Sequence, residues 1–249
     1  MSKTAIITGG GSGLGQSTAV RLAQEGINIV VVDISEKGGN ETVEMVKKLG
    51  PDAIFIKADV SKADEVKNYV DQTVEHFGSI NYFFNNAGIS GSGKFFLDTD
   101  ISEIESIVGI NLLGALYGMR YVAEVMLKNG GGSIVNTASS AGVIGQDSVV
   151  TYSATKHGIV GMTKSIVAEY AKDGLRVNSI APGPTETPMV EAFYRDNPEM
   201  KENATSGIPQ KRLGTPEEVA ELVAFLLTSK ANYINGEVIR IDGGFTNTK

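Results

Sequence analysis

Short apolar runs recur along the chain, and most are apolar at successive positions rather than at alternate ones. Continuous runs of this kind suit strands of a parallel sheet that is covered on both faces. The pattern predicts seven strands, at 4–8, 27–33, 53–58, 80–85, 132–137, 176–180 and 237–241.

Amphipathic stretches separate these runs and predict helices at about 13–25, 36–48, 62–77, 102–128, 152–172 and 216–229. Alternating strands and helices indicate an α/β fold: a single-domain, Rossmann-type, doubly wound parallel sheet of about seven strands with helices on both faces. Since no linker or repeat divides the chain, we expect one dinucleotide-binding and catalytic domain over 1–249.

The segment at about 183–212 shows the clear periodicity of neither a strand nor a helix. It carries Met189, Val190, Phe193, Tyr194, Pro198 and Met200. Because long insertions in compact domains are usually functional, we expect this segment to cover the substrate and exclude water. The expected opposite wall comprises Ser140, Val143, Ile144, Gln146 and Val149. This lining favours a small neutral ketone or secondary alcohol over a charged acid, although the apolar residues could instead pack only against each other or a neighbouring subunit.

Composition narrows the classes of function. The chain has 249 residues, 41% hydrophobic and 20% charged, which is typical of a globular protein with a core. A net charge of −7 without a basic stripe argues against a nucleic-acid partner. The lack of cysteine excludes disulfides and thiolate chemistry, and the separated His76 and His157 predict no metal site. No secretion signal or 18-residue apolar run is evident, so we expect a cytoplasmic protein without a membrane partner.

A glycine-rich loop follows the first predicted strand and leads into a helix, in the sequence Thr8-Gly-Gly-Gly-Ser-Gly-Leu-Gly15. Glycines let the backbone turn sharply and let a pyrophosphate approach the helix N-terminus. The spacing is T-G-x-x-x-G-x-G, because Gln16 stands where G-x-G-x-x-G would place its last glycine. The loop predicts a dinucleotide site that includes Gly9, Ser12, Gly13, Leu14 and Gly15.

Acidic residues end the second and third predicted strands. Asp33 can accept hydrogen bonds from both adenosine ribose hydroxyls and would repel a 2′-phosphate. Neither Ser12 nor Ile34 offers a compensating cation, so we expect NAD to be preferred over NADP. Asp59 and Val60 could contact adenine, or Asp59 could cap the following helix with Ser61; both alternatives stay open.

Tyr152 and Lys156 lie four residues apart, which places both side chains on one face of the predicted helix. A phenol keeps its proton up to a pKa of about 10, but a neighbouring ammonium stabilises the phenolate. The pair therefore predicts an acid/base device. The same spacing also arises by chance on amphipathic helices, with a half-buried tyrosine and a solvated lysine.

Further motifs are Asn85-Asn-Ala-Gly88, Asn111, Ser139, Pro182-Gly183 and the closing segment 236–244. Together with the motifs above, they resemble those of the short-chain dehydrogenase/reductase family, and the resemblance covers almost the entire chain. Within that family the likeness is greatest to NAD-linked reductases of cyclic or secondary ketones. The resemblance implies that Ser139 holds the substrate oxygen while Tyr152 gives or takes its proton. Lys156 would lower the tyrosine pKa and bind the nicotinamide ribose. The side chain of Asn111 would hold a water that relays protons to Lys156.

The resemblance also implies further cofactor contacts and an assembly. Asn86, Ala87 and Gly88 would lie under the adenine and ribose, and Pro182, Gly183 and Thr187 would face the nicotinamide. Family members pair through the helices here expected at 102–128 and 152–172 and through the C-terminal segment, which implies a homotetramer. In support, the first helix carries more apolar residues than one sheet-facing stripe needs: Ile104, Ile107, Val108, Leu112, Leu116, Met119 and Val122.

The expected function is therefore an NAD(H)-dependent oxidoreductase that interconverts a small neutral ketone and a secondary alcohol, with tyrosine acid/base catalysis. One alternative is a 3-oxoacyl-[acyl-carrier-protein] reductase, which usually draws on NADPH and needs a basic docking surface; Arg120 and Lys128 are the candidate patch. The other alternative is a non-catalytic dinucleotide sensor, which would need only the glycine loop and Asp33.

Overall fold

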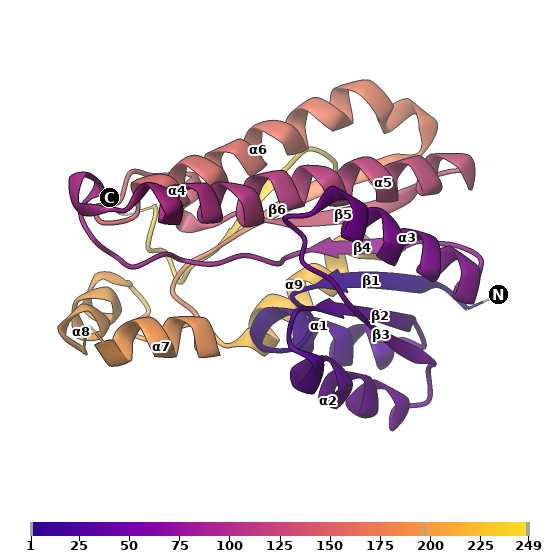
Figure 1. The fold of residues 1–249 in the computed structure, drawn as a ribbon, viewed down its shortest axis with the longest axis horizontal. Coiled ribbons are helices and arrows are strands. Elements are labelled where there is room, and N and C mark those ends of the chain that lie inside the picture. Colours follow the sequence, from indigo (N-terminus) through magenta and orange to yellow (C-terminus); the bar gives the residue numbers. More distant parts are fainter. Residues whose placement is uncertain (1, 197, 248–249) are drawn as a thin grey trace.

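The computed structural model describes residues 2–196 and 198–247, in which seven parallel strands form one sheet (Figure 1). The strands are β1 (Thr4–Thr8), β2 (Asn28–Asp33), β3 (Ala53–Lys57), β4 (Tyr82–Asn85), β5 (Gly132–Thr137), β6 (Leu175–Pro182) and β7 (Val238–Ile241). Their order is β3-β2-β1-β4-β5-β6-β7, so the direction of winding reverses between β1 and β4. The predicted fold class is confirmed.

Helices cover both faces of the sheet. They are α1 (Gly13–Ala23), α2 (Glu36–Lys47), α3 (Ala63–Phe77), α4 (Ile101–Val108), α5 (Gly114–Lys128), α6 (Val150–Tyr170), α7 (Pro188–Asp196), α8 (Pro198–Gly207) and α9 (Pro216–Leu227). Figure 1 shows α1, α2 and α9 on one face, and α3, α5 and α6 on the other. Some ends are set by local chemistry: Thr215 and Glu218 form a capping box at the start of α9.

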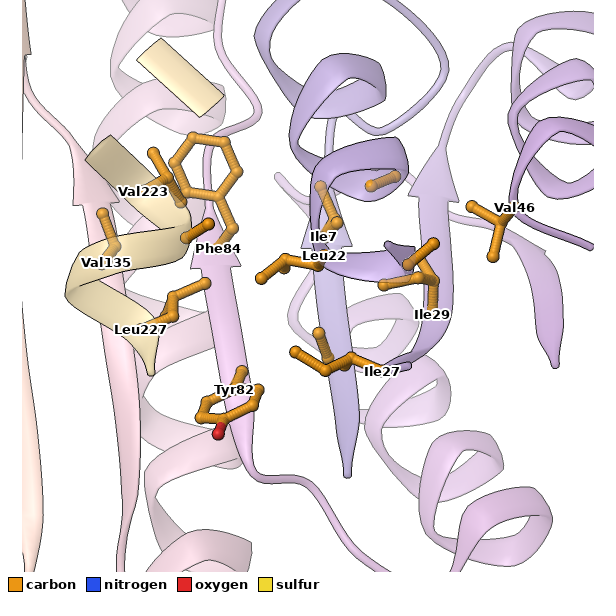
Figure 2. Close-up of a cluster of buried hydrophobic side chains, with 14 of the residues drawn as sticks. Ile7, Leu22, Ile27, Ile29, Val46, Tyr82, Phe84, Val135, Val223 and Leu227 are labelled. Carbon is orange, nitrogen blue, oxygen red and sulfur yellow. The ribbon is translucent and has the colours of Figure 1, made fainter. Parts of the chain in front are cut away.

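The two hydrophobic clusters explain why the strands are apolar at successive positions. Phe83 and Phe84 are both fully buried, but Phe83 belongs to the cluster under α3 and α5, whereas Phe84 packs with α1 and α9. Figure 2 shows the second cluster, with Val223 and Leu227 of α9 close to Phe84. Each large apolar side chain buried in this way contributes about 1.5–3 kcal/mol. A strand with helices on both faces can use every position for the core.

The segment at 183–212 differs from the expectation of a region without periodicity, since much of it forms α7 and α8. Both helices begin at a proline, Pro188 and Pro198, which is favourable at the first helical position because its missing N–H has no intrahelical partner there. The helices have only nine and ten residues, too few for a clear apolar repeat to be recognised in the sequence.

The long helix expected at 102–128 is instead α4 and α5 joined by a π-helical segment, Gly109–Leu113. In the described part of the chain, the continuous stretch Ile101–Lys128 is the one helix long and apolar enough to cross a membrane by length and composition. The sequence analysis did not single it out, because polar residues and glycines interrupt it. In the structure 44% of its apolar window is buried, and Met119, Val122 and Met126 pack in the core. One side of this helix therefore packs on the sheet, while the rest of its apolar surface is only partly covered.

Candidate active site

A cavity of about 550 Å³ opens where the strand order reverses, beyond the carboxyl ends of the strands. Segments that follow β1 through β6 contribute to its lining, together with α7. A crevice at this position is where open α/β sheets bind nucleotides. The predicted site residues converge there: all of them line the cavity except Gly15 and Asn111.

The shape of the glycine loop requires residues without a side chain at several positions. Gly9 and Gly13 have φ of +64° and +51°, in the left-handed region that glycine adopts without strain. A Cβ on Gly15 would lie 2.1 Å from the carbonyl oxygen of Gly9, so Gly15 allows α1 to pack tightly under the loop. Within the part of the chain described, no side chain caps α1 at Ser12. The first N–H groups of α1 are therefore available to an anion.

Asp33 joins the glycine loop to the end of β2. Its Oδ2 accepts a hydrogen bond from the backbone N–H of Gly11 at 2.9 Å, and its Oδ1 accepts one from Ser35 at 2.8 Å. Each carboxylate oxygen retains capacity for a second hydrogen bond. Ile34 is 69% exposed beside it and lines the cavity. Ribose binding by Asp33 stays a prediction, but the carboxylate is held in the cavity wall.

The expected alternative of a helix cap at Asp59 is wrong, because α3 has Lys62 as its N-cap, without a side-chain cap hydrogen bond among the described residues, and Asp59 instead braces the turn before the helix. Its Oδ1 accepts hydrogen bonds from the side chain and the backbone N–H of Ser61, at 2.7 and 3.0 Å. These bonds hold the pKa of Asp59 below its usual value. Asp59 and Val60 also line the cavity, so bracing and a contact with adenine are compatible.

Two buried threonines, which the sequence analysis did not assign to the site, hold the segment Asn86 to Gly88. The Thr8 hydroxyl accepts hydrogen bonds from the backbone N–H groups of Asn86 and Ala87, at 2.9 and 3.1 Å. The Thr137 hydroxyl donates to Asn86 Oδ1 at 3.1 Å. The ends of β1, β4 and β5 are thereby tied together. The sequence does contain a signal for Thr8, because Thr8 is the first residue of the glycine motif.

Lys156 is buried in the cavity wall, with an exposed fraction of 3%. Its Nζ donates to the carbonyl oxygen of Thr137 at 2.7 Å and lies 5.4 Å from the centre of the Tyr152 ring. Burial lowers the pKa of Lys156 to about 8, so the ammonium is still mostly protonated at pH 7. The alternative of a solvated lysine on an ordinary amphipathic helix is wrong.

The pKa of Tyr152 differs in direction from the expectation. Burial raises it above the usual value, and the hydrogen bond with Ser139 opposes that rise only in part. The Lys156 ammonium was expected to lower it, but that group bonds to Thr137 and lies over the ring, so desolvation of the phenolate prevails. At neutral pH Tyr152 is therefore a phenol with a proton to donate.

Ser139 contacts Tyr152 directly, whereas Asn111 bonds to the backbone of the segment after β4. The Ser139 hydroxyl accepts a hydrogen bond from the N–H of Ala141 at 3.1 Å, at the start of a short 3₁₀ helix (Ser140–Gly142), and lines the cavity. Asn111 is fully buried in the π-helical segment. Its amide donates to the carbonyl of Ile89 and accepts from the N–H of Ile89, both at 2.8 Å. The side chain thus fixes the segment after β4, and its relay role stays a prediction.

The far end of the cavity is closed by α7. Met189, Val190, Phe193 and Tyr194 line it as expected, whereas the side chains of Pro198 and Met200 lie outside the described residues. Phe193 closes against the segment after β4, since a Cβ on Gly93 would lie 2.6 Å from its ring. The Thr187 hydroxyl accepts from the N–H of Val190 at 3.3 Å, in the first turn of α7.

The opposite wall agrees with the expectation only in part. Ser140, Gln146 and Val149 line the cavity, but Val143 and Ile144 do not. Ile144 instead packs against a small cluster of Ile208, Leu213 and Phe245. Lining residues that the sequence analysis missed are mostly strand ends and their successors: Val32, Ala58, Ile89, Ser90, Ile110, Thr137, Ala138, Ala141, Pro184, Thr185 and Pro188.

Among the described residues, no group of three or more metal-ligating side chains occurs. His76 is exposed and lies 3.1 Å from Asp52, and His157 is exposed and hydrogen-bonds with Ser153 of its own helix. Of the residues that line the cavity, only Lys156 is cationic.

Comparisons with known proteins agree with this architecture. A family model described as Enoyl-(Acyl carrier protein) reductase matches residues 9–246. Levodione reductase of Leifsonia aquatica is 43% identical over 97% of this chain and 93% of its own, and cyclohexanol dehydrogenase of Acinetobacter sp. (strain SE19) is 40% identical over 98% and 95%. The crystal structure of levodione reductase superposes with a TM-score of 0.95, at 41% identity over 99% of this chain and 98% of that one.

A further solved structure, 3-ketoacyl-(acyl-carrier-protein) reductase from Brucella melitensis complexed with NADH, has a TM-score of 0.90 at 31% identity, over 98% of each chain. The parallel sheet, the cavity at the strand reversal and matches over nearly the whole chain lead to one conclusion. The protein belongs to the short-chain dehydrogenase/reductase family and is an NAD(P)-dependent oxidoreductase acting on CH–OH donors.

Proposed function

We propose that the protein interconverts a small neutral ketone and a secondary alcohol with NAD(H), and that Tyr152 is the general acid and base. The observation that carries the proposal is the convergence of Ser139, Tyr152 and Lys156 on one cavity that continues to the glycine loop. A sensor would need only the loop and Asp33. Tight NADH binding without oxidation by any ketone of a broad panel would favour the sensor.

The residues present fit a dinucleotide. The uncapped N-terminus of α1 can bind a pyrophosphate, and Asp33 and Ile34 lie where an adenosine ribose would follow. When bound, the nicotinamide supplies or accepts the hydride. Lys156, whose ammonium lies between Thr137 and the Tyr152 ring, would bind the nicotinamide ribose and stabilise the phenolate.

In ketone reduction, Ser139 holds the substrate oxygen and Tyr152 donates its proton as negative charge develops there. The raised pKa of Tyr152 suits this direction, because the phenol is protonated at neutral pH. Alcohol oxidation needs the phenolate instead. We therefore expect the rate of alcohol oxidation to increase as the pH rises, whereas the rate of ketone reduction should not increase.

The cofactor preference rests on Asp33. Its carboxylate would face the 2′-phosphate of NADP, and both of its oxygens are already fixed by backbone N–H groups, so it cannot turn away without breaking them. We expect a higher kcat/KM with NADH than with NADPH. Asp33→Ala should narrow that gap by roughly 10- to 100-fold, the size of one or two charge-assisted hydrogen bonds. Equal use of both cofactors by the wild type would contradict the proposal.

The substrate is proposed to be neutral because the lining of its end of the cavity is mostly apolar and contains no cation except Lys156. Levodione reductase and cyclohexanol dehydrogenase, by their names, are consistent with this class. Activity with a panel of cyclic and linear ketones, measured with both cofactors, tests the proposal. Turnover only of acyl-carrier-protein substrates would replace it.

The alternative of a carrier-protein reductase loses its docking patch in the structure. Glu124 lies between Arg120 and Lys128, with ion pairs of 2.6 and 2.9 Å, and so neutralises much of their charge. A basic surface for an acidic carrier is therefore weak at this position.

We also propose a homotetramer in the cytoplasm. Of the apolar residues expected to serve a second face, Ile107, Met119 and Val122 are in the core, whereas Leu116 is exposed and Ile104, Val108 and Leu112 are only partly buried. Phe95, Leu97 and Ile101, shortly before these residues in the chain, are exposed apolar residues as well. Sedimentation at micromolar concentration tests the assembly, and a mass near 26 kDa would contradict it.

A further inference from the structure

We propose that Gln146 determines substrate specificity by hydrogen-bonding a second oxygen of the substrate. The site would then prefer a small ring that carries two oxygens, such as a hydroxyketone, over the same ring with one. This inference rests on the proposed ketone and alcohol chemistry at Tyr152, and adds a recognition group on the opposite wall of the cavity.

The position of Gln146 supports the proposal. Gln146 is half-buried in the turn between the 3₁₀ helix and α6, and it lines the cavity. Its Nε2 donates to the hydroxyl of Ser140 at 3.1 Å, and Ser140 is itself buried. Ser140 directly follows Ser139, and consecutive Cα atoms are about 3.8 Å apart. Ser139 and Gln146 both line the same cavity, so one small bifunctional molecule bound there can contact both.

Gln146 has hydrogen-bonding capacity to spare. A side-chain amide offers two N–H donors and two lone pairs, and the bond to Ser140 uses one of these four. Two hydroxyls at this end already make hydrogen bonds within the protein: Thr185 donates to the carbonyl of Gly183, and Thr187 accepts from the N–H of Val190. A substrate oxygen that pairs with the remaining N–H of the amide gains a hydrogen bond that a ring without that oxygen lacks.

The backbone of the same turn is strained. Ser148 has φ of +59°, a left-handed conformation that is unfavourable for a residue with a side chain. Gln146 and Val149, on either side of Ser148, both line the cavity. Strain of this kind persists where the surrounding structure enforces it, and it concentrates at sites that position functional groups. The turn is thus held in the shape that presents Gln146 to the substrate.

The experiment compares kcat/KM for 4-hydroxycyclohexanone and cyclohexanone, with NADH, in the wild type and in Gln146→Leu. Using the ratio of the two substrates within each protein cancels their intrinsic reactivity. We expect this ratio to fall by about 3- to 10-fold in Gln146→Leu, mainly through KM, as one neutral hydrogen bond is lost. Val149→Ala, a change in the same wall that removes no hydrogen-bonding group, should affect both substrates alike and keep the ratio.

Three outcomes would overturn the inference. An unchanged ratio in Gln146→Leu, with cyclohexanone still turned over, rejects the role of Gln146 but leaves the proposed function standing. A fall in the ratio in Tyr194→Phe, without one in Gln146→Leu, assigns the second oxygen to the hydroxyl of Tyr194, another polar side chain of the lining. If the wild type reduces neither ketone with either cofactor, the proposed function and the inference fail together.

Discussion

The two ends of the cavity are built in different ways. At the cofactor end, backbone passes against backbone: a Cβ on Gly15 would lie 2.1 Å from the Gly9 oxygen, and one on Gly38 would lie 2.5 Å from the Gly11 oxygen. At the substrate end, side chains of α7 and of the turn after Ser139 close the space. Backbone contacts leave no room for substitution, whereas side-chain walls can change one residue at a time. The first end is suited to one constant ligand, and the second to a substrate that differs among relatives.

Tyr152 lies between the two ends, and its replacement gives the largest effect we expect. Tyr152→Phe removes the proton donor without touching the glycine loop, so turnover should fall by roughly 10²- to 10⁴-fold. The affinity for NADH, measured by fluorescence titration, should stay within a factor of about two. Tyr170→Phe, at the exposed end of the same helix, is the matched control. Substantial residual turnover in Tyr152→Phe would mean that another group supplies the proton.

A glycine pair tests the contrast between the ends directly. Gly15→Ala forces a Cβ into the Gly9 carbonyl, so we expect NADH affinity to fall at least 100-fold or the fold to be lost, visible in the far-ultraviolet circular dichroism. In Gly207→Ala, in α8, the added Cβ would lie 3.6 Å from the ring of Phe245, which is an ordinary contact. This variant should keep its fold and its NADH affinity. A folded Gly15→Ala protein with normal NADH affinity would show that the glycine loop can accommodate a side chain. That result would contradict the contrast between the two ends of the cavity.

Phe193 tests the substrate end by itself. Phe193→Ala removes the ring that closes α7 against Gly93, so water can enter and the wall is lost. We expect kcat/KM for ketones to fall by roughly 5- to 30-fold, about 1–2 kcal/mol in transition-state stabilisation, with NADH affinity unchanged. Arg195→Ala, an exposed change on the same helix, is the control. A matching loss of NADH affinity would show that the two ends are not separable.

The last effect concerns the stability of the fold rather than catalysis. Burial lowers the folded-state pKa of Lys156 to about 8, below the value near 10.5 of the unfolded chain, so the charge destabilises the fold. This cost is fully present below pH 8 and disappears as the pH rises toward 10.5. Without cofactor, Lys156→Met should therefore be inactive yet more stable than the wild type by about 1–3 kcal/mol at pH 7.

Thermal unfolding of the wild type and Lys156→Met at pH 7 and pH 10 measures this difference. The advantage of the variant should shrink at pH 10, because Lys156 is then neutral in the folded wild type and neutralising it costs little so close to the unfolded-state pKa. Lys47→Met, at an exposed position on α2, should show no comparable change. A variant less stable than the wild type at pH 7 would mean that the bond from Lys156 to Thr137 outweighs the cost of burial.

Much of this protein was determined by local sequence. The continuous apolar runs predicted all seven strands, and two of them, β1 and β5, with the same bounds, because a strand covered on both faces leaves a distinct pattern. The glycine loop, Asp33 and the Tyr152 and Lys156 spacing are also local, since each depends on residues within one turn or one strand end. They could be assigned to a cofactor and an acid/base role before any contact was known.

Other features depend on residues that meet only in the folded chain. Asn85, Asn136, Thr163 and Ser179 form a buried hydrogen-bonded chain across β4, β5, α6 and β6, which no spacing in the sequence reveals. Three further features also depend on the folded chain: the raised pKa of Tyr152, the hydrogen bond from Lys156 to Thr137, and the position of Gln146 beside Ser140. Burial and hydrogen-bond partners depend on all the elements packed around a group, and these are set only by the tertiary structure.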